Sequence, residues 1–444
     1  MWPAFYCWPR QSPAYLYSWR GCFPNSAVVT TMSKAVFSFT HYLGAIGTSN
    51  MATGVHTVLY PWLIVGILEG SPSDLGLAQM ALLLPNLLFI LPGGVISDGR
   101  HRGSWLSLLY LLYLVPLALL LWAVARGHLS TALVIGFGLV FGSITAFVQP
   151  ARESLLAYTD SAVMHQSVAK VLVVKFIAQG LGFAFAGLLG YIDLMALVWI
   201  QVGMFVLTAL LIRRSHPRVP EEEDARASVR DPWGELHEGL ALFRDDRRLL
   251  HLLYLVFATG VLPFGVFLVG IPVLAHQVYD GGAFLLAMLQ ILFTLGVVVA
   301  NLGVMRQTQT FIRPGKSMIV SFFWRGSLFA LTALSASFWL LLPTIFLWGF
   351  SSGLSMVLGR TILHNQVAKS HRARAVSVYQ LCLCGGTPVG AWLCGAAIER
   401  FGVTQAFVGI AVVTMAVAAV AALKSPLWGL VTGDGATTVD IKTS

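Results

Sequence analysis

SWLSLLYLLYLVPLALLLWAVA, at residues 104–125, is the stretch that decides the fold, and LSTALVIGFGLVFGSITAFVQ follows it closely at residues 129–149. Each run is long enough to cross a bilayer as a helix, because a span needs ~20 apolar residues. Charged residues make up only 11% of the chain, whereas a soluble domain needs about 25% to cover its surface. We therefore predict an all-α integral membrane protein.

Runs of this kind recur along the whole chain, and about twelve of them have the length of a span. They lie at residues 41–66, 75–97, 104–125, 129–149, 166–190, 194–212, 250–274, 282–304, 317–337, 339–359, 374–397 and 403–423. The five Cys residues show neither a disulfide framework nor the spacing of a zinc site.

The Lys and Arg residues are distributed unevenly between these runs. All but four of the 28 fall in alternate gaps or in the tails; the exceptions are Arg126 and Arg400 in the other gaps and Lys175 and Arg325 inside runs. Basic residues are retained on the cytoplasmic side during insertion, so we expect both termini in the cytoplasm. The net charge of +9 then reflects topology and contacts to anionic lipid rather than nucleic acid.

The chain divides into two halves related by a repeat. Residues 213–248 form the long polar stretch that separates six runs from six. Adding 208 to a first-half number aligns Arg152 with Arg360 (360 − 152 = 208) and Gly187 with Gly395, which indicates duplication. We predict a disordered or non-native tail at 1–40, a six-helix half at 41–212, a cytoplasmic linker at 213–249, a second six-helix half at 250–424 and a cytoplasmic tail at 425–444.

The segment GGVISDGRHR at residues 93–102 resembles the signature loop of the major facilitator superfamily. That loop usually reads as Gly, then Asp-Arg, then a basic cluster, and here Gly99 replaces the Arg that follows Asp98. Twin six-span halves are also the layout of transporters that bind their solute between the halves near mid-membrane. The resemblance implies an alternating-access transporter.

A second set of motifs is similar to one branch of that superfamily. QPARESLL at residues 149–156 looks like the Pro-Ala-Arg element of the branch that includes the enterobactin exporter and related secretion permeases, although Glu153 stands where Gln is more usual. RARAVS at 372–377, followed by GGTPVG at 385–390, is similar to that branch's entry into span 11. Members of the branch export chemically diverse compounds, so the resemblance implies export without naming the substrate.

A charge pair at the cytoplasmic edge is the first candidate for a gating contact. Asp98 ends the second run, where a carboxylate is costly unless it is paired. We predict that it pairs with Arg372 or Arg374 of the opposite half and locks the cytoplasmic side shut; a solvated charge that only fixes topology is the alternative. Arg100 and Arg102 of the same loop join these gating candidates.

Arg152 and Arg360 occupy equivalent places after the fourth and tenth runs. A planar guanidinium group can bind several backbone carbonyls at once, so we interpret both residues as clamps at helix ends that take part in gating. Contact with an anionic substrate or a phospholipid is the second interpretation.

No acidic residue lies deep in any run, so the intramembrane carboxylate common in proton-coupled carriers is missing. If protons are the coupling ion, His56 is the best buried candidate, because His titrates near neutral pH. A packing role is the alternative for His56, and Asp98 and Glu153 are further candidates nearer the cytoplasm.

The two intramembrane cations have different surroundings. Lys175 begins a polar stripe that Gln179 continues one turn later, so it faces the solute or else snorkels to the headgroups. Arg325 lies in the ninth run, which is peripheral in the superfamily, and a lipid phosphate or a helix C-terminus is its other possible partner. The full set of predicted substrate-binding residues is Asn50, Thr53, His56, Thr57, Gln149, Lys175, Gln179, Gln290 and Arg325.

These groups suit an amphipathic solute that is neutral or anionic. We predict an exporter of a siderophore or a drug-like compound that works as a monomer, contacts membrane lipids, and needs no cofactor or metal. A lipid flippase on the same fold and a non-transporting membrane scaffold or sensor are the alternatives. An enzyme is disfavoured, because the HExxH zinc pattern, the GxSxG nucleophile elbow and the Gly-rich phosphate loop ending in Gly-Lys are absent from the sequence.

Overall fold

A computed structural model describes residues 38–98, 102–156, 164–215, 232–306, 313–334, 337–368 and 371–430. Ten helical segments within these ranges have both the length and the apolar composition of a membrane span. Two more have the length: α1 (Phe39–Trp62), which continues into the π-helical η1 (Leu63–Ile67), and α2 (Pro72–Asp98). The predicted all-α membrane fold is confirmed, and each of the twelve predicted runs coincides with one of these segments.

The first half contains α1, η1, α2 and four further crossings. The third crossing is interrupted at Tyr113, where one helix ends and the next begins. The remaining elements of this half are α3 (Arg102–Leu112) and α4 (Leu114–Ala125), which together form that crossing, then α5 (Thr131–Leu156), α6 (Met164–Gly187) and α7 (Leu194–Ser215).

The second half follows α8 (Pro232–Asp245), which is too short to span. Its first crossing changes between α- and π-helix several times, since it runs through α9 (Arg247–Gly265), η4 (Val266–Gly270), α10 (Ile271–Val273) and η5 (Leu274–Val278). The other five are α11 (Ala283–Arg306), α12 (Pro314–Leu334), α13 (Phe338–Gln366), α14 (Arg372–Phe401) and α15 (Val403–Lys424).

The first helix of each half begins in the register of the repeat. Helix α9 begins 208 positions after α1 (247 − 39 = 208). The offset deduced from spans 4 and 5 therefore also fits the start of the first span in each half.

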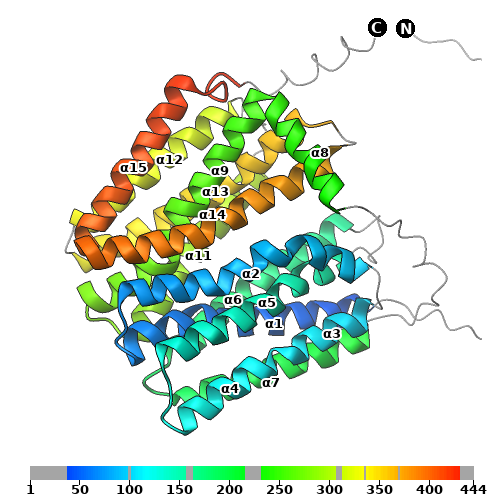
Figure 1. The fold of residues 1–444 in the computed structure, drawn as a ribbon, viewed down its shortest axis with the longest axis vertical. Helices are drawn as coiled ribbons and strands as arrows, with labels where there is room; N and C mark the ends of the chain where they lie inside the picture. Colours follow the sequence, from blue (N-terminus) through cyan, green and yellow to red (C-terminus); the bar gives the residue numbers. More distant parts are fainter. Residues whose placement is uncertain are drawn as a thin grey trace, which may run out of the picture.

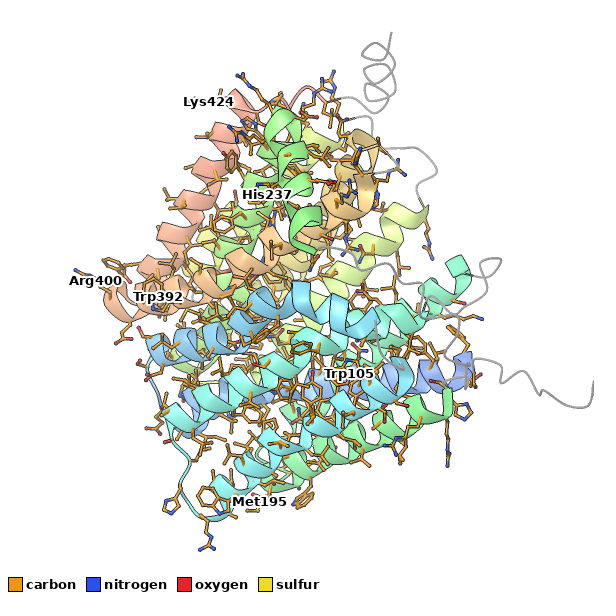
Figure 2. The ribbon with its side chains drawn as sticks, turned by 45° about the vertical axis from the view of Figure 1, so that its right-hand side comes forward. Trp105, Met195, His237, Trp392, Arg400 and Lys424 are labelled. Carbon is orange, nitrogen blue, oxygen red and sulfur yellow. The ribbon has the colours of Figure 1, made fainter. Side chains whose placement is uncertain are left out.

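The two halves meet along α2 with α14 and along α6 with α11. We name the end of the bundle that carries α8 the α8 end and the opposite one the far end. Helices α2 and α14 lie side by side at the far end and diverge toward the α8 end (Figure 1). Trp392 and Arg400 mark the far end of α14, and Lys424 and His237 lie toward the α8 end (Figure 2).

Close backbone approach binds the first helix of each half to the fifth. A Cβ atom on Gly54 of α1 would overlap the Gln179 carbonyl oxygen of α6, and one on Gly260 of α9 would lie 2.8 Å from the Leu383 carbonyl oxygen of α14. In lipid, small residues allow this approach and the packing energy that comes with it. The glycines in the middle of spans 5 and 11 are therefore packing positions within each half, and those near the far ends of these spans contact the opposite half.

Candidate functional site

The inner face of α1 is identified by the partners of its other faces. Gly54 packs on α6, Thr48 is bonded to Thr208 of α7 (2.7 Å), and the Tyr42 hydroxyl donates to the Arg152 carbonyl oxygen of α5 (3.1 Å). Thr53 and Thr57 lie on the remaining arc, where Thr53 is exposed and Thr57 partly so. Thr53 and Thr57 are thus on the arc of α1 that is turned away from these contacts, and their role in a cavity stays a prediction.

Three cations from both halves gather on the α8 side of this region. Lys175 of α6 is half-buried, and it is repelled by both Arg152 of α5 and Arg360 of α13. Among the described residues, Glu153 is the one acidic group that acts on Lys175. Arg152 and Arg360 are repeat-related, so the structure brings two predicted gating residues together with the predicted substrate-binding Lys175. The cluster keeps an excess of positive charge.

The neutral residues predicted to bind substrate are placed unequally. Gln149 and Gln179 are partly exposed beside the basic cluster. Asn50 is buried and its amide donates to the Ile46 carbonyl oxygen (2.7 Å). Gln290 is buried too, and its Oε1 has no hydrogen-bond partner among the described residues. The last two belong to helix packing in this conformation.

His56 lies in an aromatic cluster of the first half rather than beside Thr53. Its ring stacks on Phe141 with centroids 4.0 Å apart and on Tyr60 at 5.1 Å, and it is only 6% exposed. Nε2 has no hydrogen-bond partner in the described part of the chain. The geometry is that of the packing alternative, because His56 points at α5, one face away from the inner arc. The sequence showed the helix but not which side of it His56 occupies.

Arg325 is completely buried inside the second half, at 0% exposure. It lies against α13, where its Nη2 donates to the Ser355 hydroxyl (3.2 Å). In this conformation its complete burial keeps it out of contact with bulk lipid. The predicted contact with substrate or lipid phosphate thus has no geometric basis in this conformation, because the guanidinium points inward rather than outward from a peripheral helix.

The gating residues are described only in part. Arg100 lies outside the described residues, as do the side chains of Asp98 and Arg102. Arg374 forms a salt bridge with Glu238 of α8 (2.5 Å), and Arg372 donates to the Val367 carbonyl oxygen (3.2 Å). Sequence reasoning missed Glu238, since the acidic face of a linker helix gives no sign of where it docks. A pairing of Asp98 with Arg374 stays a prediction for a different conformation.

The far end is closed by contacts between the halves. The rings of Trp62 and His276 meet edge to face with centroids 5.5 Å apart, and the Ser73 backbone N–H donates to Glu399 (3.1 Å). A groove of about 450 Å³ lies outside this closure; it is lined by Trp62, Ile67, residues 189–194, Gly282 and Ala283. The inner region is therefore sealed at the far end, where α2 meets α14, and these helices separate toward the α8 end (Figure 1).

A family model described as transmembrane secretion effector matches residues 28–435, nearly the whole chain. The chain belongs to the transmembrane secretion effector family. This secretion effector is accordingly a transporter of the major facilitator superfamily and not an enzyme, as the motifs implied. No curated protein sequence matches it.

Solved structures with the same fold are distant in sequence. The nucleoside transporter NupG is 13% identical with a TM-score of 0.67, covering 86% of this chain and 97% of that one. A bacterial homologue of the human lysosomal transporter Spinster, inward-facing and unoccupied, is 13% identical with a TM-score of 0.63, covering 90% and 97%. The human organic anion transporter MFSD10 is 16% identical with a TM-score of 0.60, covering 86% and 98%. At these identities, the likeness to these structures establishes only the fold of this secretion effector.

Proposed function

We propose that the protein is an alternating-access exporter of a small amphipathic anion, such as a siderophore or a drug-like compound. The basic cluster of Arg152, Lys175 and Arg360 carries this proposal. Its cations come from both halves, and Glu153 is the one acidic group of the described residues that acts on Lys175. An anion bound there would relieve their mutual repulsion and join the halves, so it favours the movement that closes the α8 end.

The α8 end is the cytoplasmic one in this proposal, and the membrane is the bacterial inner membrane. The uneven distribution of Lys and Arg supports this orientation, since basic loops stay in the cytoplasm. Substrate then enters from the cytoplasm in the conformation described and leaves at the far end. Labelling of Ser228→Cys in intact cells tests the orientation, and we expect no reaction with a membrane-impermeant thiol reagent. A reaction would place residue 228 outside the cell, and the proposed orientation and direction of transport would then be reversed.

Lys175→Gln tests the substrate class directly. It removes the charge at similar length, and loss of one charged interaction costs about 1–3 kcal/mol, or about 5- to 150-fold in affinity. We expect the half-saturation concentration for anionic members of a labelled siderophore panel, taken up by inverted vesicles, to rise accordingly. Lys175→Arg keeps the charge and should be milder.

Lys170→Gln is the matched control, because Lys170 is on the same helix but is exposed. Its kinetics should equal those of the wild type. Equal kinetics for Lys175→Gln and Lys170→Gln, with normal expression, would assign Lys175 to snorkelling and remove the argument for an anion. A flippase would instead depend on a lipid contact of Arg325, whose complete burial gives that alternative no support.

A further inference from the structure

Arg325 is a buried cation held by neutral groups. Its Nε donates to the Ser321 carbonyl oxygen (3.3 Å), its Nη2 donates to the Ser355 hydroxyl (3.2 Å), and its guanidinium lies over the Phe322 ring at 4.2 Å. Its Nη1 is buried and has no hydrogen-bond partner among the residues that the structure describes. The side chain therefore has one buried nitrogen, Nη1, whose N–H groups have no acceptor among the described residues.

The charge of Arg325 lacks a compensating carboxylate. Arg325 forms no ion pair with any residue in the part of the chain that the structure describes. Among acidic residues with described side chains, Glu153 and Glu399 lie near helix ends and Glu238 is exposed on α8, while Arg325 is midway along α12. A buried cation without a counter-charge is strongly unfavourable, and intramembrane cations as a rule have an anionic partner.

The face of α13 that carries Ser355 is made of small residues. One face of α13 presents Ser351, Ser355 and Gly359 at successive turns, and both serines are nearly fully buried. The Tyr379 hydroxyl of α14 lies against Gly359, where an added Cβ would be 2.6 Å from it, and Tyr379 interacts electrostatically with Arg325. Hydroxyl groups beside a guanidinium are typical ligands for an anion.

The equivalent place in the first half has no such cation. Arg325 corresponds to Leu117 (325 − 208 = 117), which is fully buried. One turn earlier, a neutral bond between Tyr113 and Thr145 (2.9 Å) connects the third crossing to α5. The charge is thus a specific feature of the second half and is not required for packing these two helices.

We infer that Arg325, Ser355 and Tyr379 hold a small inorganic anion, a chloride-sized monovalent ion, between α12, α13 and α14. One negative charge balances the single positive charge of the guanidinium group. Because the site is completely buried, the ion must lose its hydration shell easily and must be small enough to fit beside the small residues of α13. The ion neutralises Arg325 and fills the hydrogen-bonding capacity of Nη1. All three residues belong to the second half, and Tyr379 also interacts electrostatically with Arg360 of the basic cluster.

Halide-dependent thermal unfolding of the purified full chain tests this inference. The protein is exchanged into sodium gluconate, and chloride or bromide is added at constant ionic strength, because a ligand that binds only the folded state raises the unfolding midpoint. We expect a saturable rise of several degrees for the wild type with both halides and none with sulfate. Arg325→Met should lose the rise while remaining folded, since it replaces a buried cation by an apolar side chain of similar length.

Two further variants keep the inference falsifiable if Arg325→Met does not fold. Ser355→Ala keeps the charge and removes one donor, so its half-saturating halide concentration should rise several-fold. Arg313→Met removes an exposed Arg just before α12 and should respond to halide as the wild type does. A wild type that ignores halide, or an identical response in Ser355→Ala and Arg313→Met, would overturn the site. Bromide soaked into crystals should give an anomalous peak beside the Arg325 guanidinium, and its absence there would count equally against it.

Discussion

The two interfaces between the halves are related by the repeat but are built differently. At the far end of α2 and α14, Gly76 faces Gly395 at backbone contact, and a Cβ on Gly395 would overlap the Pro72 carbonyl oxygen. The corresponding residues of α11 and α6 are Phe284 (76 + 208 = 284) and Gly187 (395 − 208 = 187). There an added Cβ on Gly187 would meet the Ala287 side chain at 2.8 Å. One interface joins two backbones, and the other joins a backbone to side chains.

This difference indicates how the far end opens. The α2–α14 interface brings two backbones together at its closest point, where no side chain can move aside, so it resists separation. The α6–α11 interface lies beside the groove that is lined by Gly282, Ala283 and residues 189–194. We expect the halves to rotate about the α2–α14 contact and to separate on the α6–α11 side. There the interface is formed by side chains and borders the groove.

The largest effect on stability and transport is expected when one methyl group is added to either interface in turn. Gly395→Ala must push the Pro72 backbone away, and overpacking of this kind costs about 1–3 kcal/mol. Gly187→Ala displaces only a side chain and should cost less. Thermal unfolding of the two purified variants, together with their transport rates, measures the contrast.

A rescue experiment makes that contrast stricter. Ala287→Gly should restore Gly187→Ala, because it removes the methyl group that the new Cβ meets. No single side-chain truncation should restore Gly395→Ala, since its partner is a carbonyl oxygen. Equal losses in Gly395→Ala and Gly187→Ala would show that the two interfaces are alike.

A smaller effect is expected at the α8 end of the same interfaces. Asp98 and Arg374 belong to α2 and α14, whereas their counterparts in α11 and α6 are Arg306 (98 + 208 = 306) and Gln166 (374 − 208 = 166), which cannot form an ion pair. If Asp98 pairs with Arg374 when the α8 end closes, Asp98→Asn should lower transport and destabilise the closed state by about 1 kcal/mol, the upper end for partly exposed pairs.

The charge-swapped double variant Asp98→Arg with Arg374→Asp should recover transport, and Arg306→Gln should leave it unchanged. Distances between spin labels at the α8 ends of α2 and α14 report the population of the closed state directly. Additive losses in a double-mutant cycle of Asp98 and Arg374 would exclude the pair.

The smallest effect is expected for the hydrogen bond that fastens α2 to α14 at the surface. Glu399 accepts from the Ser73 backbone N–H, and the counterparts of these residues, Tyr191 and Gly281, have no such bond among the described residues. Glu399→Gln weakens an exposed bond and should slightly raise the fraction of molecules labelled at a far-end cysteine. Arg400→Gln, one residue further along an exposed edge, should not. A larger change for Glu399→Gln than for Gly395→Ala would reverse this order of effects.

The sequence predicted the fold well because its signals are long and repeated. Twelve apolar runs, the linker between halves and the 208-residue offset are each spread over many residues, so local exceptions do not disturb them. The third crossing shows the limit of the apolar pattern, because its break at Tyr113 lies within an uninterrupted apolar run. The local signal is Pro116, which has no N–H to donate to the Leu112 carbonyl oxygen.

The site was predicted less completely, because helical spacing gives a face but not its neighbours. For Thr53, Lys175 and Arg360 the helix and its face follow from the sequence, and their roles in binding and gating stay predictions. His56 is one residue from Thr57, and that step of about 100° turns it toward α5 instead. Arg325 was identified as unusual from its depth, but its burial depends on the packing of α12 against α13.

The ends of the first helix in each half have a consequence for movement. Trp62 directly precedes the π-helical η1 and His276 lies inside the π-helical η5, so the two rings that close the far end are attached to widened turns. A widened turn holds one surplus residue, and passing that residue along the helix rotates the segment beyond it by about 100° without unwinding it. The Trp62–His276 contact at the far end can therefore be opened by rotation of these helix ends about their own axes, before the two halves move relative to each other.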